Sequence, residues 1–258
     1  MANGGGSGWQ PYPIRIALNA EIIAIGTELL LGEITDTNSA RIARALRGVG
    51  LDLWWISAVG DNEARIAEAV AQGARRANVV VTSGGLGPTV DDPTRAAVAR
   101  AFGRPIEYRP ELWQQIEARF QRFGRTPTEN NRKQAYVPEG ALALENPVGT
   151  APCFVVEHAN GVVISLPGVP RELDHMLEHA VLPFLRQRFD LASTIVARTL
   201  RTVAIGESLI DARIADLEKL SNPTVGLAAH PGQTDIRIVA KAPTVAEAEA
   251  MIEPVVAD

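Results

Sequence analysis

Apolar and polar positions alternate in a regular order over the first third of the chain. Short apolar runs at 20–25, 51–59 and 78–83 are typical of buried strands. The segments between them, 38–47 and 62–77, carry apolar residues at helical spacing. A βαβαβ order favours a parallel sheet with right-handed crossovers and helices on both faces. We therefore expect a three-layer α/β/α domain with a mostly parallel sheet.

A hairpin is expected in the second half of this domain. The apolar runs 154–158 and 162–166 flank Ala159-Asn160-Gly161, which is a typical turn sequence. Helices are expected before and after the hairpin, at 109–123, 128–134 and 171–189.

The pattern changes near residue 190. A strand at 194–205, a helix at 208–220, strands at 224–229 and 234–242 and a helix at 244–255 follow. This βαββα order predicts a small α+β domain. We divide the chain into a Gly-rich tail at 1–19, expected to be disordered, a main domain at 20–190 and a small domain at 191–258.

Composition narrows the class of protein. The chain has 258 residues, a formal net charge of −5 and 46% hydrophobic residues, which is ordinary for a soluble globular protein. The acidic balance argues against a nucleic-acid partner, and no apolar run is long enough to span a membrane. The single cysteine, Cys153, excludes an intrachain disulfide and fits a reducing compartment, so a cytoplasmic location is expected.

Residues 83–92 form the strongest candidate for chemistry. They connect an apolar strand to a helix that we expect to begin at Pro93. Glycines let a backbone approach an anion closely, and N–H groups at a helix start point towards it. The adjacent carboxylates Asp91 and Asp92 suggest a divalent cation beside a phosphate. The candidate ligand-binding residues of the turn are Gly84, Gly85, Gly87 and Thr89.

Polar residues also follow the two preceding strands. Ligands of parallel sheets bind at the carboxyl ends of the strands, so these residues are expected to converge on the turn. Asp61 follows the second strand and is either the N-cap of the next helix or a metal ligand. The candidates after the first strand are Gly26, Thr27, Glu28 and Asn38.

A basic cluster lies at 130–134. A solvated helix face is the ordinary interpretation of such a cluster. Lys133 is alternatively a donor to phosphoryl oxygens, and Asn131 a ligand-binding residue.

These motifs together resemble the N-terminal part of the CinA (competence/damage-inducible) proteins. The matching segments are 24–32, 59–61, 83–92 and 166–172, the last of which contains Pro167 and Gly168 as further substrate-binding candidates. The resemblance implies a MogA/MoaB-like molybdopterin-binding fold followed by a small KH-type module. It also implies a homodimer.

The resemblance implies a metal-dependent pyrophosphatase that acts on ADP-ribose or a related dinucleotide and yields AMP and ribose 5-phosphate. The metal would be Mg, Mn or Co, with Asp61, Asp91 and Asp92 as ligands or general base and Lys133 beside a phosphoryl oxygen. A molybdopterin-binding or adenylyl-transfer role in molybdenum-cofactor synthesis is the alternative. An RNA-binding role is disfavoured, because the small domain lacks the Gly-x-x-Gly loop of RNA-binding KH domains.

Overall fold

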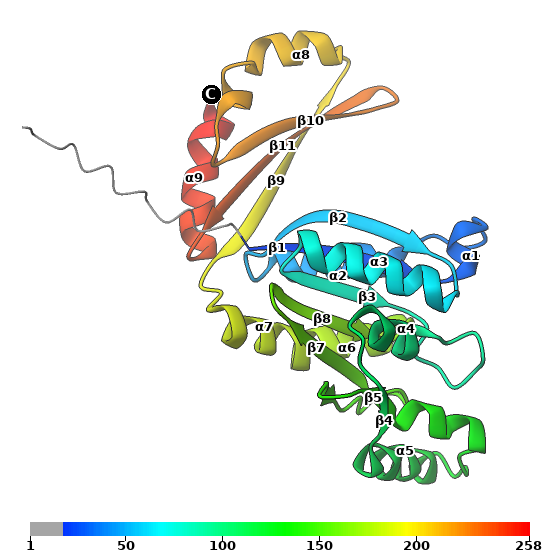
Figure 1. The fold of residues 1–258 in the computed structure, drawn as a ribbon. Coiled ribbons are helices and arrows are strands. Elements are labelled where there is room, and N and C mark those ends of the chain that lie inside the picture. Colours follow the sequence, from blue (N-terminus) through cyan, green and yellow to red (C-terminus); the bar gives the residue numbers. More distant parts are fainter. Residues whose placement is uncertain (1–17) are drawn as a thin grey trace, which may run out of the picture.

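The computed structural model describes residues 18–258, which form a large α/β domain and a smaller α+β domain (Figure 1). The disordered tail expected at 1–19 lies outside the described residues except for its last two positions. Of these, Asn19 already belongs to the first strand, which begins one residue earlier than the strand expected at 20–25.

A six-stranded sheet with strand order β2-β1-β3-β8-β7-β6 forms the centre of the large domain. Strands β2, β1, β3 and β8 run parallel, and β7 is antiparallel to both β8 and β6. The predicted parallel sheet and the predicted hairpin are both confirmed. In chain order the strands are β1 Asn19–Ile25, β2 Asp52–Val59, β3 Val79–Ser83, β6 Leu142–Leu144, β7 Cys153–His158 and β8 Gly161–Leu166.

Helices cover both faces of this sheet because side chains of each strand alternate between two buried clusters. In β1, Ile23 packs with α3, α4 and α5, whereas its neighbour Ile22 packs with α2, α6 and α7. The predicted three-layer fold is thus confirmed. The helices are α2 Thr37–Arg47, α3 Glu63–Arg76, α4 Thr94–Ala101, α5 Pro110–Arg122, α6 Pro170–Met176 and α7 Leu182–Phe189.

Several predicted boundaries were wrong. Pro93 is the N-cap of α4 and not its first residue. The helix expected at 171–189 is interrupted by a π-helical turn, Leu177–Val181. In a regular α-helix the ring of Pro183 would clash with the carbonyl of the residue four positions earlier, and the π-helical turn avoids this clash. The helix expected at 128–134 is the 3₁₀ segment Glu129–Ala135. Short elements that were not predicted are α1 Thr27–Leu30, β4 Ile106–Tyr108, β5 Tyr136–Pro138 and β6.

The small domain has the predicted βαββα order and stands beside the end of the large sheet (Figure 1). Its antiparallel sheet has the order β10-β11-β9, and α9 packs on it through Ala248 and Ile252. The helix expected at 208–220 ends at Ile214, before a 3₁₀ turn at Leu217–Lys219. The elements are β9 Thr194–Val203, α8 Glu207–Ile214, β10 Thr224–His230, β11 Gln233–Ala242 and α9 Val245–Ala257. Within residues 18–258, no helix is long and apolar enough to cross a membrane.

A buried carboxylate ties the central strand to a helix. Glu21 of β1 is 1% exposed, and Arg76 at the end of α3 donates two hydrogen bonds to it, of 2.7 and 2.6 Å. Ser57 of β2 donates a third, of 2.9 Å. A buried carboxylate needs such partners because removing a charge from water is costly.

Replacement of Arg76 by alanine is therefore expected to lower the free energy of unfolding by about 2 kcal/mol, because Glu21 would stay buried with only the serine as donor. Urea denaturation at pH 7 measures this change. The control is Arg75→Ala, since Arg75 is exposed and makes no ion pair with residues 18–258. Equal stabilities of the two variants would contradict this account of Glu21.

Candidate functional site

A crevice of about 510 Å³ lies at the carboxyl ends of β1, β2, β3 and β8. Right-handed crossovers bring these ends to one edge of the sheet, as the order of elements predicts. Eleven of the fifteen candidate residues named from the sequence line this crevice. They are Gly26, Glu28, Asp61, Gly84, Gly85, Gly87, Thr89, Asp91, Asp92, Pro167 and Gly168.

The loop after β3 presents a row of backbone donors. Thr94 bonds the carbonyl oxygens of Gly84 (2.9 Å, from Oγ1) and Gly85 (3.3 Å, from its N–H), and Arg95 bonds that of Leu86 (2.7 Å). In a trans peptide the C=O of one residue and the N–H of the next point in opposite directions. The N–H groups of Gly85, Leu86 and Gly87 thus point away from α4, and they have no acceptor among the described residues. Such a row of N–H groups is a cradle for an anion.

Two of the glycines are required by the shape of this loop. Gly84 has φ 113° and Gly85 has φ 65°, a region that other residues rarely adopt. A Cβ at Gly84 would collide with the carbonyl oxygen of Ile25, and one at Gly85 with the hydroxyl of Thr94. The loop therefore depends on glycine at both positions for backbone geometry and for space.

A buried cation lies behind the same loop. Arg95 is 3% exposed, and its guanidinium donates to the carbonyls of Leu86 and, at 3.4 Å, Gly87. Its Nε has no partner among the described residues, and it forms no ion pair with them. Burial lowers the pKa of Arg95 to about 10, so the group is still charged at neutral pH. Its positive charge favours an anion on the other side of the loop.

The three aspartates differ in what they contact. Asp61 accepts the N–H of Thr27 at 2.7 Å, and Thr27 in turn accepts the N–H of Asp61 at 3.1 Å. Asp92 accepts the N–H and the hydroxyl of Thr89 at 2.9 and 2.6 Å. Asp91 has no hydrogen bond or ion pair with a described residue. It is therefore the freest of the three carboxylates to contact a ligand.

The donor chemistry of the crevice fits a divalent cation that is shared with a ligand. Five carboxylates line the crevice, but no lysine or arginine does. A phosphate bound there would be repelled by these carboxylates, and a divalent cation between them would offset that repulsion. Within residues 18–258, however, no three His, Cys, Asp or Glu side chains are close enough to hold a metal alone. Mg²⁺ is commonly held by one or two carboxylates together with substrate phosphates. The five acids are Glu28, Asp61, Asp91, Asp92 and Glu172.

Two further candidates hold the walls of the crevice in place. The ammonium of Lys133 donates to the carbonyl of Thr89 at 2.6 Å, which leaves two N–H donors for a ligand. Burial lowers the pKa of Lys133. Asn38 donates to the carbonyl of Gly168 at 2.7 Å and to the hydroxyl of Ser83 at 3.2 Å, and so joins α2 to the loop after β8.

Asn131 does not reach the crevice. It is 7% exposed, and its Oδ1 accepts the N–H and hydroxyl of Thr128 in a capping box. Its Nδ2 donates to Gln134 at 3.2 Å, and Gln134 is the residue of this segment that lines the crevice. The spacing Thr128-x-x-Asn131 is typical of a capping box, and the prediction for Asn131 did not take it into account.

Sequence reasoning also missed three residues that shape the crevice. Glu172 and Thr150 line it, and Arg95 supports the glycine loop. Asn146, which is buried, donates to Glu172 at 2.6 Å and to the carbonyl of Ala151 at 3.1 Å. Glu172 belongs to a motif segment noted in the sequence, whereas an arginine inside a helix gives no sign of being buried.

Comparisons with known proteins identify the family of the chain. Residues 21–187 match the family described as "Probable molybdopterin binding domain", and residues 197–258 match "Damage-inducible protein CinA KH domain". The crystal structure of the protein CinA of unknown function from Thermoplasma acidophilum is 34% identical, with a TM-score of 0.59 over 63% of this chain and 95% of that one. The chain belongs to the CinA family.

Curated relatives support the same family. A Halothermothrix orenii protein whose name assigns it to the competence-damage inducible proteins is 44% identical over 237 residues, 92% of this chain and 57% of its own length. A CinA-like protein of Prochlorococcus marinus is 42% identical over 91% of this chain and 55% of its own length. The chain thus spans little more than half the length of these relatives.

Replacement of Gly85 by alanine tests the glycine loop. The left-handed backbone and the contact with Thr94 are together expected to lower the free energy of unfolding by about 3 kcal/mol. Gly103→Ala is the matched control, because Gly103 has φ 61° but open space around its Cα. It isolates the backbone contribution, expected to be about 1 kcal/mol. Thermal and urea denaturation measure both values, and equal losses would contradict the steric part of the argument.

Proposed function

We propose that the crevice binds the pyrophosphate of an adenine-nucleotide ligand and that the chain hydrolyses it, with ADP-ribose as the first substrate to test. The observation that supports this proposal most strongly is the row of free N–H groups at Gly85, Leu86 and Gly87 above the buried charge of Arg95. These groups match the oxygens of a phosphate, and the carboxylates nearby match a cation-assisted reaction on phosphorus.

In the proposed reaction, water attacks one phosphorus of the pyrophosphate and the bond to the bridging oxygen breaks. ADP-ribose and water yield AMP and ribose 5-phosphate, and the proton of the water passes to a carboxylate of the crevice. Asp91 is the carboxylate we assign to this step, because it is free of protein partners. Lys133 borders the crevice through its bond to the carbonyl of Thr89, and its two remaining N–H donors would turn towards the developing phosphoryl charge.

Asp61 and Asp92, which each use only Oδ2 in hydrogen bonds with described residues, would hold a divalent cation at this edge of the sheet through Oδ1. When bound, Mg²⁺, Mn²⁺ or Co²⁺ would neutralise phosphate charge and acidify a coordinated water. The glycine loop would fix the pyrophosphate for in-line attack, which is the larger part of catalysis in phosphoryl transfer.

A second candidate function is molybdopterin binding or adenylyl transfer to molybdopterin. The family description for residues 21–187 favours this candidate directly. An adenylylated molybdopterin would also contain a pyrophosphate and an adenine, so the same loop and crevice would serve it. The two candidates differ in the chemistry that follows binding.

The hydrolysis proposal predicts AMP release from ADP-ribose with at least one of Mg²⁺, Mn²⁺ and Co²⁺, and none after chelation with EDTA. Asp91→Asn is expected to lower kcat by about 100-fold or more without changing stability, since it removes a group whose only role is towards the ligand. Chromatography of the nucleotide products measures both results.

Glu33→Gln is the control for that experiment, because Glu33 is an exposed acid that does not line the crevice. No AMP with any of the three metals would exclude hydrolysis of ADP-ribose. Tight molybdopterin binding in the same preparation, or AMP transfer to it from ATP, would then support the second candidate.

A further inference from the structure

The end of α5 carries a basic segment that the function proposed above does not use. Residues 121–126 are all exposed, and we call them the basic tip. They include Arg122, Arg125 and the ring of Phe123, which is 59% exposed. Neither arginine side chain has a hydrogen bond or ion pair with a described residue. Unpaired arginines beside an exposed aromatic ring are typical of a protein–protein interface.

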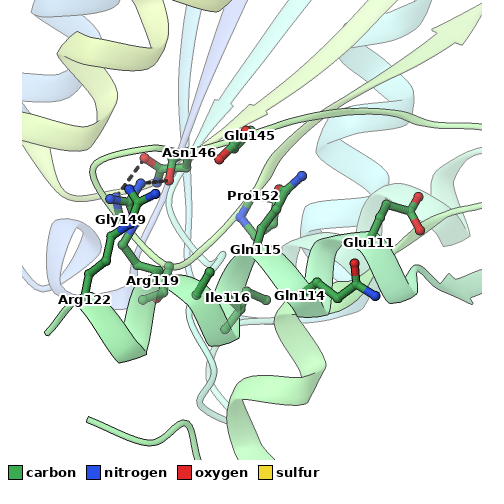
Figure 2. Close-up of a pocket in the computed structure, with 12 residues that line it drawn as sticks. Glu111, Gln114, Gln115, Ile116, Arg119, Arg122, Glu145, Asn146, Gly149 and Pro152 are labelled. Atoms are coloured by element: carbon green, nitrogen blue, oxygen red, sulfur yellow. Dashed lines mark hydrogen bonds between the residues drawn. The ribbon is translucent and has the colours of Figure 1, made fainter. Parts of the chain in front are cut away.

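The loop at 145–152 separates α5 from the crevice of the same chain. Asn146 in this loop donates to Glu172 of the crevice, and its carbonyl accepts a hydrogen bond from Arg119 of α5 at 3.1 Å. Figure 2 shows Arg119 and Arg122 beside Asn146 and Gly149. Neither arginine lines the crevice. The charges at this helix end therefore do not serve the crevice of their own chain.

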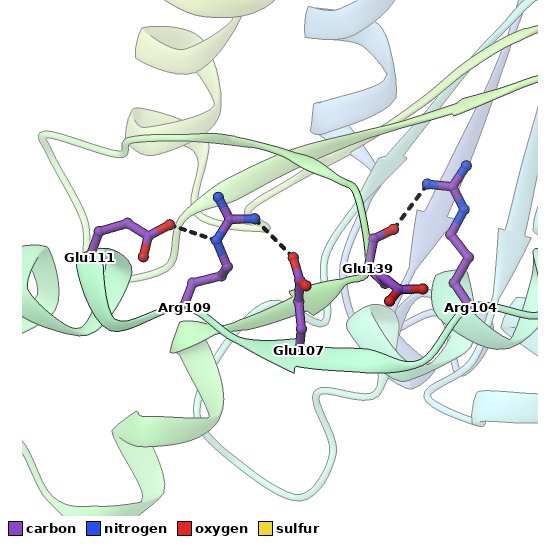
Figure 3. Close-up of polar contacts among 5 residues, drawn as sticks. All are labelled: Arg104, Glu107, Arg109, Glu111 and Glu139. Carbon is purple, nitrogen blue, oxygen red and sulfur yellow. Dashed lines mark hydrogen bonds and ion pairs between the residues drawn. The ribbon is translucent and has the colours of Figure 1, made fainter.

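Two arginines that precede α5 are already paired. Arg109 donates to Glu107 at 2.8 Å and to Glu111 at 2.5 Å. Arg104 donates to the carbonyl of Glu139 at 3.1 Å (Figure 3). The arginines of the basic tip differ because they have no such partner among the described residues.

The backbone of the basic tip is fixed at both ends. The N–H of Gly124 donates to the carbonyl of Gln121 at 2.9 Å. The N–H of Arg125 donates to the carbonyl of Phe120, also at 2.9 Å, which completes the Schellman pattern of a helix end. After the tip, a capping box starts the 3₁₀ segment Glu129–Ala135. The tip is thus a built projection and not a loose flap that could fold over its own crevice.

The mouth of the crevice has the opposite charge and an apolar rim. Five carboxylates line the crevice, and no arginine or lysine does. Val90, between two lining residues of the glycine loop, is 92% exposed, and Val169 after β8 is 53% exposed. The exposed apolar residues of α1 and of the turn after it are Leu30, Leu31 and Ile34. Exposed apolar residues gathered around a crevice mark an interaction site.

The basic tip and the crevice complement each other and lie on one side of the domain. Both α1 and α5 stand on the side to which β2 points (Figure 1). A two-fold axis on that side brings the tip of each copy to the crevice of the other, and the contact then closes with two chains. Arginines meet carboxylates in this contact, and Phe123 meets the apolar rim.

We propose that the basic tip of each copy covers the crevice of a second copy of this chain, and that Arg125 of the second copy enters the crevice. Its guanidinium would face the glycine loop across the pyrophosphate and neutralise charge on the phosphoryl oxygens. Arg122 and Phe123 would pack on the rim. The role of Arg125 rests on the proposed pyrophosphate ligand, whereas the contact between the copies does not.

Sedimentation velocity tests the contact, and a dimer is the expected result for the unmodified chain. Arg122→Glu combined with Arg125→Glu is expected to weaken the dimer by about 10-fold or more, because attraction to the carboxylates becomes repulsion. Arg75→Glu is the matched control, since Arg75 is also exposed and makes no ion pair with residues 18–258. A monomer at every concentration, or equal dissociation constants for the tip variant and the control, would overturn the proposal.

Mixing of subunits tests the role of Arg125 in a chain that hydrolyses ADP-ribose. Asp91→Asn and Arg125→Ala are each expected to be nearly inactive alone. An equimolar mixture is expected to recover about a quarter of the unmodified activity, because half of the dimers are mixed and each mixed dimer has one site with both residues. Full activity of Arg125→Ala alone, or no recovery in the mixture, would overturn the role of Arg125.

Failure of hydrolysis and failure of the contact give different results. A dimer that dissociates in the tip variant but not in the control, in a chain that releases no AMP, would support the contact and reject hydrolysis. Calorimetric titration with inorganic pyrophosphate then replaces the activity measurement. Arg125→Ala is expected to weaken pyrophosphate binding about 5-fold, since it removes a charge-assisted donor, and unchanged affinity would overturn the role of Arg125.

Discussion

The glycine loop after β3 depends on how its carbonyl oxygens are held. Thr94 and Arg95, the first two residues of α4, bond three successive carbonyls, and this turns the next three N–H groups to the other side of the loop. Burial of the Arg95 charge is unfavourable by itself, as its lowered pKa indicates. An anion on the opposite side of the loop would offset part of that cost, so the proposed ligand would also stabilise the fold.

The rest of the crevice is arranged around this loop by strand topology. The ends of β1, β2 and β8 bring acids and the segment 167–168 to the same edge. Asn146 holds the outer wall, since its amide donates to Glu172 on the crevice side and its carbonyl accepts from Arg119 of α5.

The sequence allowed the sheet, both covering layers and most of the crevice to be predicted, because each depends on local patterns. The period-two pattern of the strands predicted which side chains are buried on each face of the sheet, and the positive φ of Gly84 and Gly85 is a property of the turn itself. Features that depend on distant contacts were missed. The bond from Asn146 to Glu172 joins residues that are 26 positions apart. The burial of Arg95 within α4 leaves no mark in the local pattern, and Asn131 had a cap that competed with its predicted role.

The most direct test of whether the glycine loop binds a pyrophosphate is a titration of the chain with inorganic pyrophosphate. The amide ¹⁵N and ¹H chemical shifts of the loop residues are the readout. The account predicts saturable downfield shifts of the Gly85, Leu86 and Gly87 amide protons, with no change at Gly103. Unchanged shifts for the three loop amides, while pyrophosphate binds elsewhere on the chain, would contradict it.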